Sequence, residues 1–177
     1  GVALSIFMSV MMLALSKGLL TSSAASGIPE NVMLLSKGAE SLETSAVETA
    51  YYNLLKGQSG IAKDSRGEPL LSPEAYLYSN VTFPGISVAG RPRAVVRGVW
   101  PIAAQVHKQF KLTEGDYPDR GFQVAAGKLA AVKLGVPEET LQIGKSVSFE
   151  GHDWKIVGRF EAPGTVLDSE LWANLDD

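Results

Sequence analysis

Residues 145–160 read KSVSFEGHDWKIVGRF, two strand-like runs on either side of a short polar stretch. The runs cover 145–149 and 154–160, and their aromatic and β-branched residues favour strands. The stretch Glu150-Gly151-His152-Asp153 between them predicts a four-residue hairpin loop. Because a hairpin joins antiparallel strands, part of the sheet is expected to be antiparallel.

Short strands and short helices alternate on both sides of this hairpin. Strands are expected at 31–36, 74–83, 94–99 and 122–125, and helices at 45–56, 102–110, 127–134 and 166–175. This mixed order predicts an α+β fold, a mixed sheet with short helices.

The predicted helix over 45–56 has a capping box of Ser45 and Glu48, and Gly57 stands at its end. Five residues at helical spacing are expected to form its buried face: Val47, Ala50, Tyr51, Leu54 and Leu55.

Composition excludes several classes of protein. The chain has 177 residues, 45% hydrophobic and 20% charged, with 16 basic and 19 acidic residues and a formal net charge of −3. This is too apolar for a disordered chain. The absence of cysteine excludes a disulfide framework and a thiolate zinc site. A net charge near zero gives no general attraction for nucleic acid, so no nucleic-acid partner is expected.

The N-terminal segment is uncharged from residue 1 to 16, and Lys17 is the only charged residue before Glu30. A spanning helix needs roughly 20 mostly apolar residues, so residues 1–27 are interpreted as a truncated transmembrane helix and its membrane exit. A signal peptide and a core helix remain alternatives, although the first lacks its basic start and the second would need burial on every side. Residues 28–177 are then expected to form an extracytoplasmic domain, incomplete at its C-terminus.

Two short motifs resemble a phosphate-binding loop and a nucleophile turn, but each lacks the neighbouring elements that such a site needs. Gly144-Lys145-Ser146 ends like a phosphate-binding loop, but Glu139 stands where that loop needs glycine, and a strand follows instead of a helix. Gly57-Gln58-Ser59-Gly60 approaches the nucleophile turn of hydrolases, but a helix precedes it instead of a strand. Both are interpreted as turns.

The titratable residues show no spacing typical of a catalytic or metal-binding site. His107 and His152 are expected to be solvated, since a catalytic metal site needs three protein ligands. No catalytic, cofactor-binding or metal-binding residue is assigned, and no cofactor is expected. Four carboxylates near the end are expected on a solvated helix face instead of in acid–base catalysis: Asp168, Glu170, Asp176 and Asp177.

Aromatic residues at strand and helix positions are more often core than ligand-binding. Trp172, beside acidic residues, is the exception and is interpreted as a candidate contact surface. Segment 84–92, bracketed by glycine and proline, is a candidate binding loop. The aromatic residues considered are Tyr51, Tyr52, Trp100, Trp154 and Trp172.

Short segments in a particular order and spacing cover nearly the whole chain. They are Asn31-Val32, Val96-Arg97-Gly98-Val99, Val124-Ala125-Ala126-Gly127, Leu129-Ala130, Leu134-Gly135, Ile143-Gly144, Val147, Trp154-Lys155-Ile156-Val157-Gly158 and Asp168-Ser169-Glu170-Leu171-Trp172. After a membrane helix, this pattern resembles the FtsX-like permeases of ABC transporters, and the soluble part is similar to the MacB-type periplasmic core domain. Gly127 would allow a close turn there, and Gly158 a bend or bulge.

The resemblance implies a non-enzymatic permease subunit of the bacterial inner membrane, with residues 28–177 on the extracytoplasmic side. It implies an ABC ATPase in a separate subunit or domain, a homo- or heterodimer of permeases, contact with membrane lipid, and a periplasmic adaptor or envelope protein as partner. Family members serve in export, lipoprotein release or the control of cell-wall enzymes. Two alternatives stay open: a membrane-anchored binding module without an ABC partner, and an anchored hydrolase using Ser59 and the late carboxylates.

Overall fold

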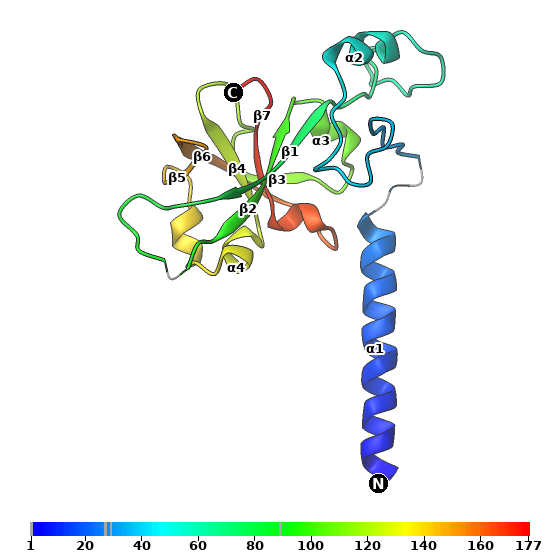
Figure 1. Cartoon of the computed structure of the whole chain (residues 1–177), viewed down its shortest axis with the longest axis vertical. Coiled ribbons are helices and arrows are strands. Elements are labelled where there is room, and N and C mark those ends of the chain that lie inside the picture. Colours follow the sequence, from blue (N-terminus) through cyan, green and yellow to red (C-terminus); the bar gives the residue numbers. More distant parts are fainter. Residues whose placement is uncertain (1, 27, 29, 89) are drawn as a thin grey trace.

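A mixed β-sheet follows a long N-terminal helix (Figure 1). The computed structural model describes residues 2–26, 28, 30–88 and 90–177. Its sheet has seven strands in the order β1-β2-β7-β4-β6-β3, with β5 paired to β6. The strands are β1 (Glu74–Asn80), β2 (Arg93–Val99), β3 (Lys111–Gly115), β4 (Gln123–Gly127), β5 (Ser146–Phe149), β6 (His152–Glu161) and β7 (Leu171–Asn174). The helices are α1 (Val2–Ser26), α2 (Thr49–Lys56), α3 (Ala103–Val106) and α4 (Ala130–Leu134), with the 3-10 turns η1 (Glu138–Leu141) and η2 (Val166–Ser169).

The predicted fold class is confirmed. β2 pairs with β7 and β4 pairs with β6 in parallel, while the other pairs are antiparallel. β6 also has the predicted irregularity at Gly158, because Val124 pairs with Ile156 and Ala125 with Gly158, which leaves Val157 as a bulge.

The hairpin of β5 and β6 is tighter than predicted. Phe149 pairs with His152, so the loop contains only Glu150 and Gly151. Their φ angles are 48° and 78°, as a type I′ turn requires. The four-residue loop was therefore wrong, because His152 and Asp153 belong to the ladder.

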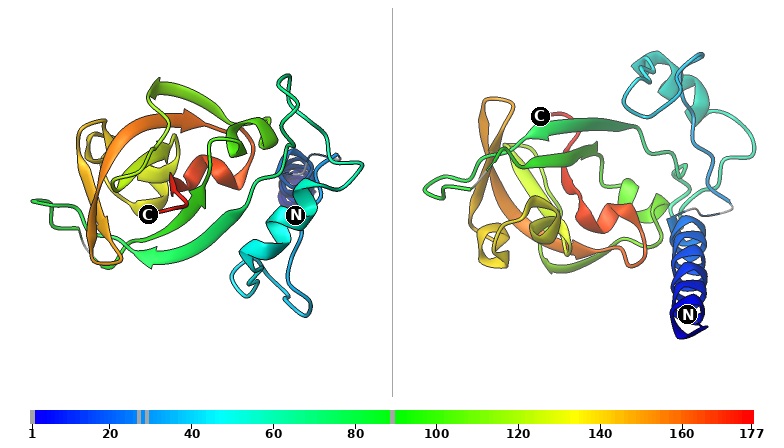
Figure 2. Two further views of the ribbon diagram at one scale, coloured as in Figure 1. Left: turned by 90° about the horizontal axis from the view of Figure 1, so that it is seen from above. Right: turned by 60° about the horizontal axis from the view of Figure 1, so that its bottom comes forward.

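The sheet closes on itself at one end. Just beyond β1, the Thr82 amide donates to the Ser148 carbonyl at 2.9 Å, and the Ser148 amide donates back at 2.8 Å. Since β5 also pairs with β6, six strands form a ring, and Figure 2 shows them curving around when seen from above. This single bridge covers only one end of two edge strands, β1 and β5.

Two buried clusters lie on opposite faces of the strands. Leu171 and Ala173 of β7 join the larger cluster, together with apolar residues of α4, while Trp172 joins the smaller one. This alternation is the two-residue period of a strand. Both faces of β7 are therefore buried, and all four of its residues are in the interior.

This burial explains why the predicted helix over 166–175 was wrong. The segment forms the turn η2 and the strand β7, which lies between β2 and β4. A strand buried on both faces has no polar alternation to reveal it. The strand β3 was not predicted, and the helix expected at 102–110 shrinks to α3.

The predictions for 31–56 were largely wrong in detail. No strand forms at 31–36 in the structure, where Val32 is 83% exposed. The Ser45 hydroxyl accepts a hydrogen bond from the Ser36 amide instead of capping a helix, and α2 begins at Thr49. α2 has no buried residue, so its expected buried face is exposed or half-buried.

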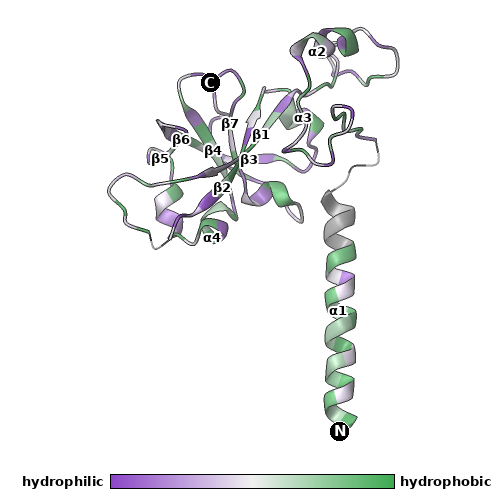
Figure 3. Ribbon diagram, in the orientation of Figure 1, coloured by the Kyte–Doolittle hydropathy of each residue, from purple (hydrophilic) through white to green (hydrophobic). Residues whose placement is uncertain are grey.

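α1 agrees with the predicted N-terminal helix. It runs for 25 residues, and Figure 3 shows its coloured part, from the N-terminal end upward, as mainly apolar. Its segment Val2–Leu20 is long and apolar enough to cross a membrane, and none of it is buried in the protein. Residues 1 and 27, the ends of the predicted segment, lie outside the described residues.

We expect Gly158→Ala to lower the free energy of unfolding. An added Cβ would lie 2.1 Å from the Asp116 carbonyl oxygen, so the strand or its neighbour must shift. Overpacking of this kind costs about 1–3 kcal/mol. Urea denaturation of the full chain in detergent micelles, followed by tryptophan fluorescence, measures the change.

Gly57→Ala is the matched control, because its Cβ would meet no atom closer than 3.8 Å and its φ of −90° suits alanine. Equal stability of the two variants would contradict the close approach at Gly158.

Candidate functional site

A buried arginine joins three strands. Arg97 on β2 donates from Nε and Nη2 to the two carboxylate oxygens of Glu170, both at 2.7 Å. Its Nη1 donates to Glu74 Oε2 on β1, also at 2.7 Å. Glu170 directly precedes β7, so one guanidinium ties β1, β2 and β7 together. Such bidentate, charge-assisted bonds are the strong ones among protein hydrogen bonds.

Strand register explains this arrangement. Tyr76 pairs with Arg97, and Arg97 pairs with Trp172, so the three side chains form one row across β1, β2 and β7. Glu74 and Glu170 are each two residues before a member of this row and therefore share its face. Glu170 is only 1% exposed, and Trp172 Nε1 donates to it at 3.1 Å.

Electrostatics favour the charged forms of Glu74 and Arg97. Burial would raise the pKa of Glu74, but the hydrogen bond and charge of His107 and the charge of Arg97 outweigh it and lower that pKa to about 2. Burial likewise opposes the charged guanidinium, but bonds to Glu170 and the charges of both carboxylates raise the pKa of Arg97. Burial, with a smaller effect of Glu74, raises the pKa of Tyr117.

His107 extends the network to α3. Its Nε2 lies 2.7 Å from Glu74 Oε1, and its ring meets the edge of Trp172 with centroids 5.5 Å apart. Phe110 stacks on the same Trp172 ring at 4.5 Å. The turn that contains α3 is thereby fastened to the sheet by one polar and two aromatic contacts.

The segment after α1 touches the same turn. Asn31 Nδ2 donates to the Val106 carbonyl at 2.9 Å, and Glu30 lies 4.0 Å from Lys108. His107 stands between these two residues of the turn. The contacts therefore run continuously from the residues after α1, through the α3 turn, to the buried arginine.

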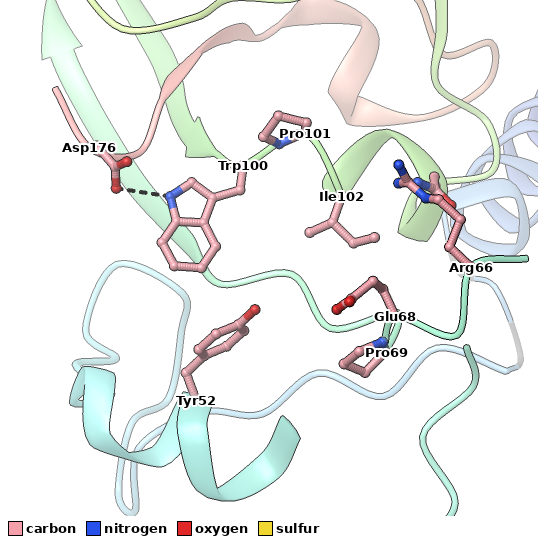
Figure 4. Close-up of a pocket in the computed structure, with 9 residues that line it drawn as sticks. Tyr52, Arg66, Glu68, Pro69, Trp100, Pro101, Ile102 and Asp176 are labelled. Atoms are coloured by element: carbon pink, nitrogen blue, oxygen red, sulfur yellow. Dashed lines mark hydrogen bonds between the residues drawn. The ribbon is translucent and has the colours of Figure 1, made fainter. Parts of the chain in front are cut away.

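An open pocket lies beside this turn, with a volume of about 420 Å³ (Figure 4). Tyr52 of α2 meets Trp100 edge-on, with ring centroids 5.3 Å apart. Trp100 Nε1 donates to Asp176 at 2.9 Å, as the dashed line in Figure 4 marks. Pro69 and Ile102 complete its apolar wall.

The chemistry of the arginine network is structural. Each carboxylate oxygen of Glu74 and Glu170 already accepts a hydrogen bond from Arg97, His107 or Trp172. Acid–base catalysis needs a carboxyl within reach of a substrate proton. The network instead acts as a clamp between separate elements of the fold.

The structure corrects the prediction for the late carboxylates. Asp168 and Glu170 are buried, not solvated, because η2 packs against α4 and Glu170 leads into the interior strand β7. Asp168 accepts a hydrogen bond from the Ala162 amide at 2.9 Å. Asp176 binds Trp100 and Arg120, while Asp177 accepts from the amides of residues 121 and 122.

The other candidate residues stay apart from the clamp. Gly144-Lys145-Ser146 forms a turn that leads into β5, as predicted, and Ser59 lies in an exposed turn. His152 begins β6, where its ring stacks on Phe122 with centroids 4.3 Å apart. The expected solvation of His107 was wrong, because burial beside Glu74 and Trp172 leaves its side chain 21% exposed.

The aromatic residues considered in the sequence differ in burial and in position. Trp154 and Trp172 are buried, so Trp172 is no contact surface. Tyr51 is exposed, and Trp100 with Tyr52 lines the pocket. Segment 84–92 connects β1 to β2, and residue 89 lies outside the described part.

Sequence reasoning missed Arg97 and Glu74 as members of a site. A usable signal existed, because Arg97 interrupts the apolar run AVVRGV. A charge within a buried strand needs a charged partner. The sequence alone does not say which carboxylate supplies it.

The fold is similar to that of extracytoplasmic domains solved from ABC-type transporters, and this chain spans less than two thirds of their length. The periplasmic region of MacB from Actinobacillus actinomycetemcomitans matches with a TM-score of 0.55 and 15% identity, over 80% of this chain and 62% of that chain. The extracellular domain of the ABC-type transporter YknZ from Gram-positive bacteria matches with a TM-score of 0.53 and 16% identity, over 72% of this chain and 62% of that chain. The predicted resemblance is thus confirmed as a likeness of fold. No family model and no curated protein matches the sequence.

We expect Arg97→Met to destabilise the fold by about 3–5 kcal/mol, because it leaves the buried carboxylate of Glu170 and the half-buried carboxylate of Glu74 without their cation. The double variant Arg97→Met/Glu170→Gln should recover part of this loss, since one of those charges is removed. Urea midpoints of the full chain at neutral pH measure both effects.

The ion pair of Lys111 and Glu161, 3.6 Å apart, provides the control, because the Lys111 side chain is 74% exposed. Lys111→Met should change stability by less than about 1 kcal/mol. A similarly small effect of Arg97→Met would contradict the clamp.

Acid should weaken the clamp through Glu74. Its pKa falls from 4.5 to about 2 on folding, so its stabilisation is complete above pH 4.5 and is lost as pH falls toward 2. The loss between pH 7 and pH 3 is about 2 kcal/mol. Urea denaturation at both pH values should show Glu74→Gln losing less stability than the wild type, and equal losses would refute the assignment.

Proposed function

We propose that the chain is part of an ABC transporter permease, with α1 in the bacterial inner membrane and residues 28–177 as its extracytoplasmic domain. Its role would be to couple ATP-driven motion of the membrane helices to export, lipoprotein release or envelope mechanotransmission. The fold and the apolar helix α1 support this proposal. The observation that carries it is the contact between Asn31 and the Val106 carbonyl, at 2.9 Å.

That contact matters because force needs a stiff connection. A displacement of α1 would reach the α3 turn through Asn31 and the Glu30–Lys108 pair. His107 would pass it to Glu74, and Glu74 to Arg97 in the sheet. Close-packed interiors resist compression, so the strands would move with the turn and not deform around it.

The proposed assembly includes parts outside this chain. ATP hydrolysis would occur in a separate ATPase subunit or domain, and two permeases would form a homo- or heterodimer. A periplasmic adaptor or envelope protein would receive the motion. The subunit itself would be non-enzymatic.

A membrane-anchored binding module is the second candidate function. The pocket of Tyr52 and Trp100 favours it, because half-buried aromatic rings beside prolines offer a surface for a peptide. This module would act without an ABC partner.

Purification separates these functions. The intact protein, tagged and extracted from its native membrane in mild detergent, should bring an ATPase with it and hydrolyse ATP only in that complex. ATPase activity of the purified subunit alone, or repeated isolation without an ATPase, would count against the permease function.

In that complex, Asn31→Ala should weaken the coupling about fivefold, the equivalent of one hydrogen bond of about 1 kcal/mol. Fluorescence transfer between labels on α1 and on α4, which packs against β2 of the sheet, should report a smaller ATP-dependent change, while ATP hydrolysis persists. Asn53→Ala on the exposed face of α2 is the matched control. An unaltered signal in Asn31→Ala would exclude this route.

A further inference from the structure

Three aliphatic side chains project from one edge of the domain. Val132 on α4 is 76% exposed, Val166 on η2 is 65% exposed, and Leu129 at the start of α4 is 47% exposed. α4 and η2 are neighbours, because the Leu129 amide donates to the Asp168 carbonyl at 2.7 Å. Single exposed aliphatic residues are ordinary, whereas a contiguous group indicates a contact surface.

Lysines accompany these side chains. Lys128 and Lys133 flank Leu129 and Val132 in sequence, and both are exposed. Lys128 also lies 3.6 Å from Glu161, which neutralises part of its charge. Aliphatic side chains beside lysines match the boundary of a bilayer, where the apolar part enters the lipid and the ammonium group stays among the headgroups.

The position of this edge indicates the partner. Figure 1 is drawn with the long axis vertical, and α4 and η2 lie along the lower border of the domain, level with the upper turns of α1. Height along that axis can be read from a single view. If Val2–Leu20 crosses the membrane, as the proposed function requires, the α4–η2 edge comes to the level at which α1 leaves it.

We propose that Lys128, Leu129, Val132, Lys133 and Val166 form a lipid-contact patch that rests on the outer leaflet of a membrane containing anionic phospholipid. This inference depends on the proposed membrane anchoring by α1. The helix would hold the patch close to the lipid, so a small apolar area suffices for contact. Two lysines add attraction for anionic headgroups. The patch gives the domain a second support beside α1 and sets its tilt on the membrane.

Single cysteines can test the patch, because the chain has none of its own. Val132→Cys carries an environment-sensitive fluorophore in the full chain, reconstituted into phosphatidylcholine vesicles with a minority of phosphatidylglycerol. Spin-labelled lipid serves as the quencher. We expect quenching at Val132 to be at least about twofold stronger than at Leu54→Cys, an aliphatic position on α2 that is 63% exposed.

A label at Leu13→Cys in α1 separates the two proposals. Quenching at Leu13 with none at Val132 overturns the patch and leaves the membrane anchor intact. Absence of quenching at Leu13 overturns the anchor itself. Shielding of Val132 only when another protein is added would identify a protein contact and would overturn the lipid assignment.

The charge is tested by Lys128→Gln/Lys133→Gln. With this double variant, the extra quenching contributed by phosphatidylglycerol should disappear, while quenching in pure phosphatidylcholine persists. Unchanged dependence on phosphatidylglycerol would contradict the role of the lysines.

Discussion

The guanidinium of Arg97 is the point on which the fold depends. It donates two hydrogen bonds to Glu170, 73 positions away in sequence, and one to Glu74, 23 positions away. β7 has only four residues and pairs in parallel with β2. So short a strand has few ladder bonds of its own, and the bidentate contact at its start helps to hold it between β2 and β4. A buried charge without a partner is costly, so the native fold must bring Arg97, Glu170 and Glu74 into contact with one another.

The same clamp connects the interior to the N-terminal part of the chain. His107, in the α3 turn, hydrogen-bonds to Glu74, and Asn31 donates to the carbonyl of Val106, the residue before His107. A turn held on both sides can transmit displacement, whereas a mobile loop would absorb it. The lipid-contact patch on α4 and η2 would give the domain a second point of support, so α1 could tilt it as well as pull it.

Some elements were predictable because their signals are local. The apolar run in α1 and the hairpin around Glu150 and Gly151 need only neighbouring residues to define them. The segment 166–175 failed because Leu171 and Trp172 are buried on opposite faces, which removes any periodic pattern. The strand expected at 31–36 failed for the opposite reason. Its apolar residues satisfy a strand pattern, but no neighbouring strand pairs with them in the described structure.

The sequence by itself determined the apolar helix, the presence of the β5–β6 hairpin, an irregularity beside Gly158 and the α+β class, because short-range sterics and composition define each of them. Tertiary structure alone decided that Glu170 is the partner of Arg97 and that Thr82 closes the ring onto Ser148. A charged residue in a strand requires a partner, but any carboxylate can satisfy that requirement until the chain is folded. Register and burial then bring two carboxylates, Glu170 and Glu74, to the guanidinium and leave the others in solvent or with different donors.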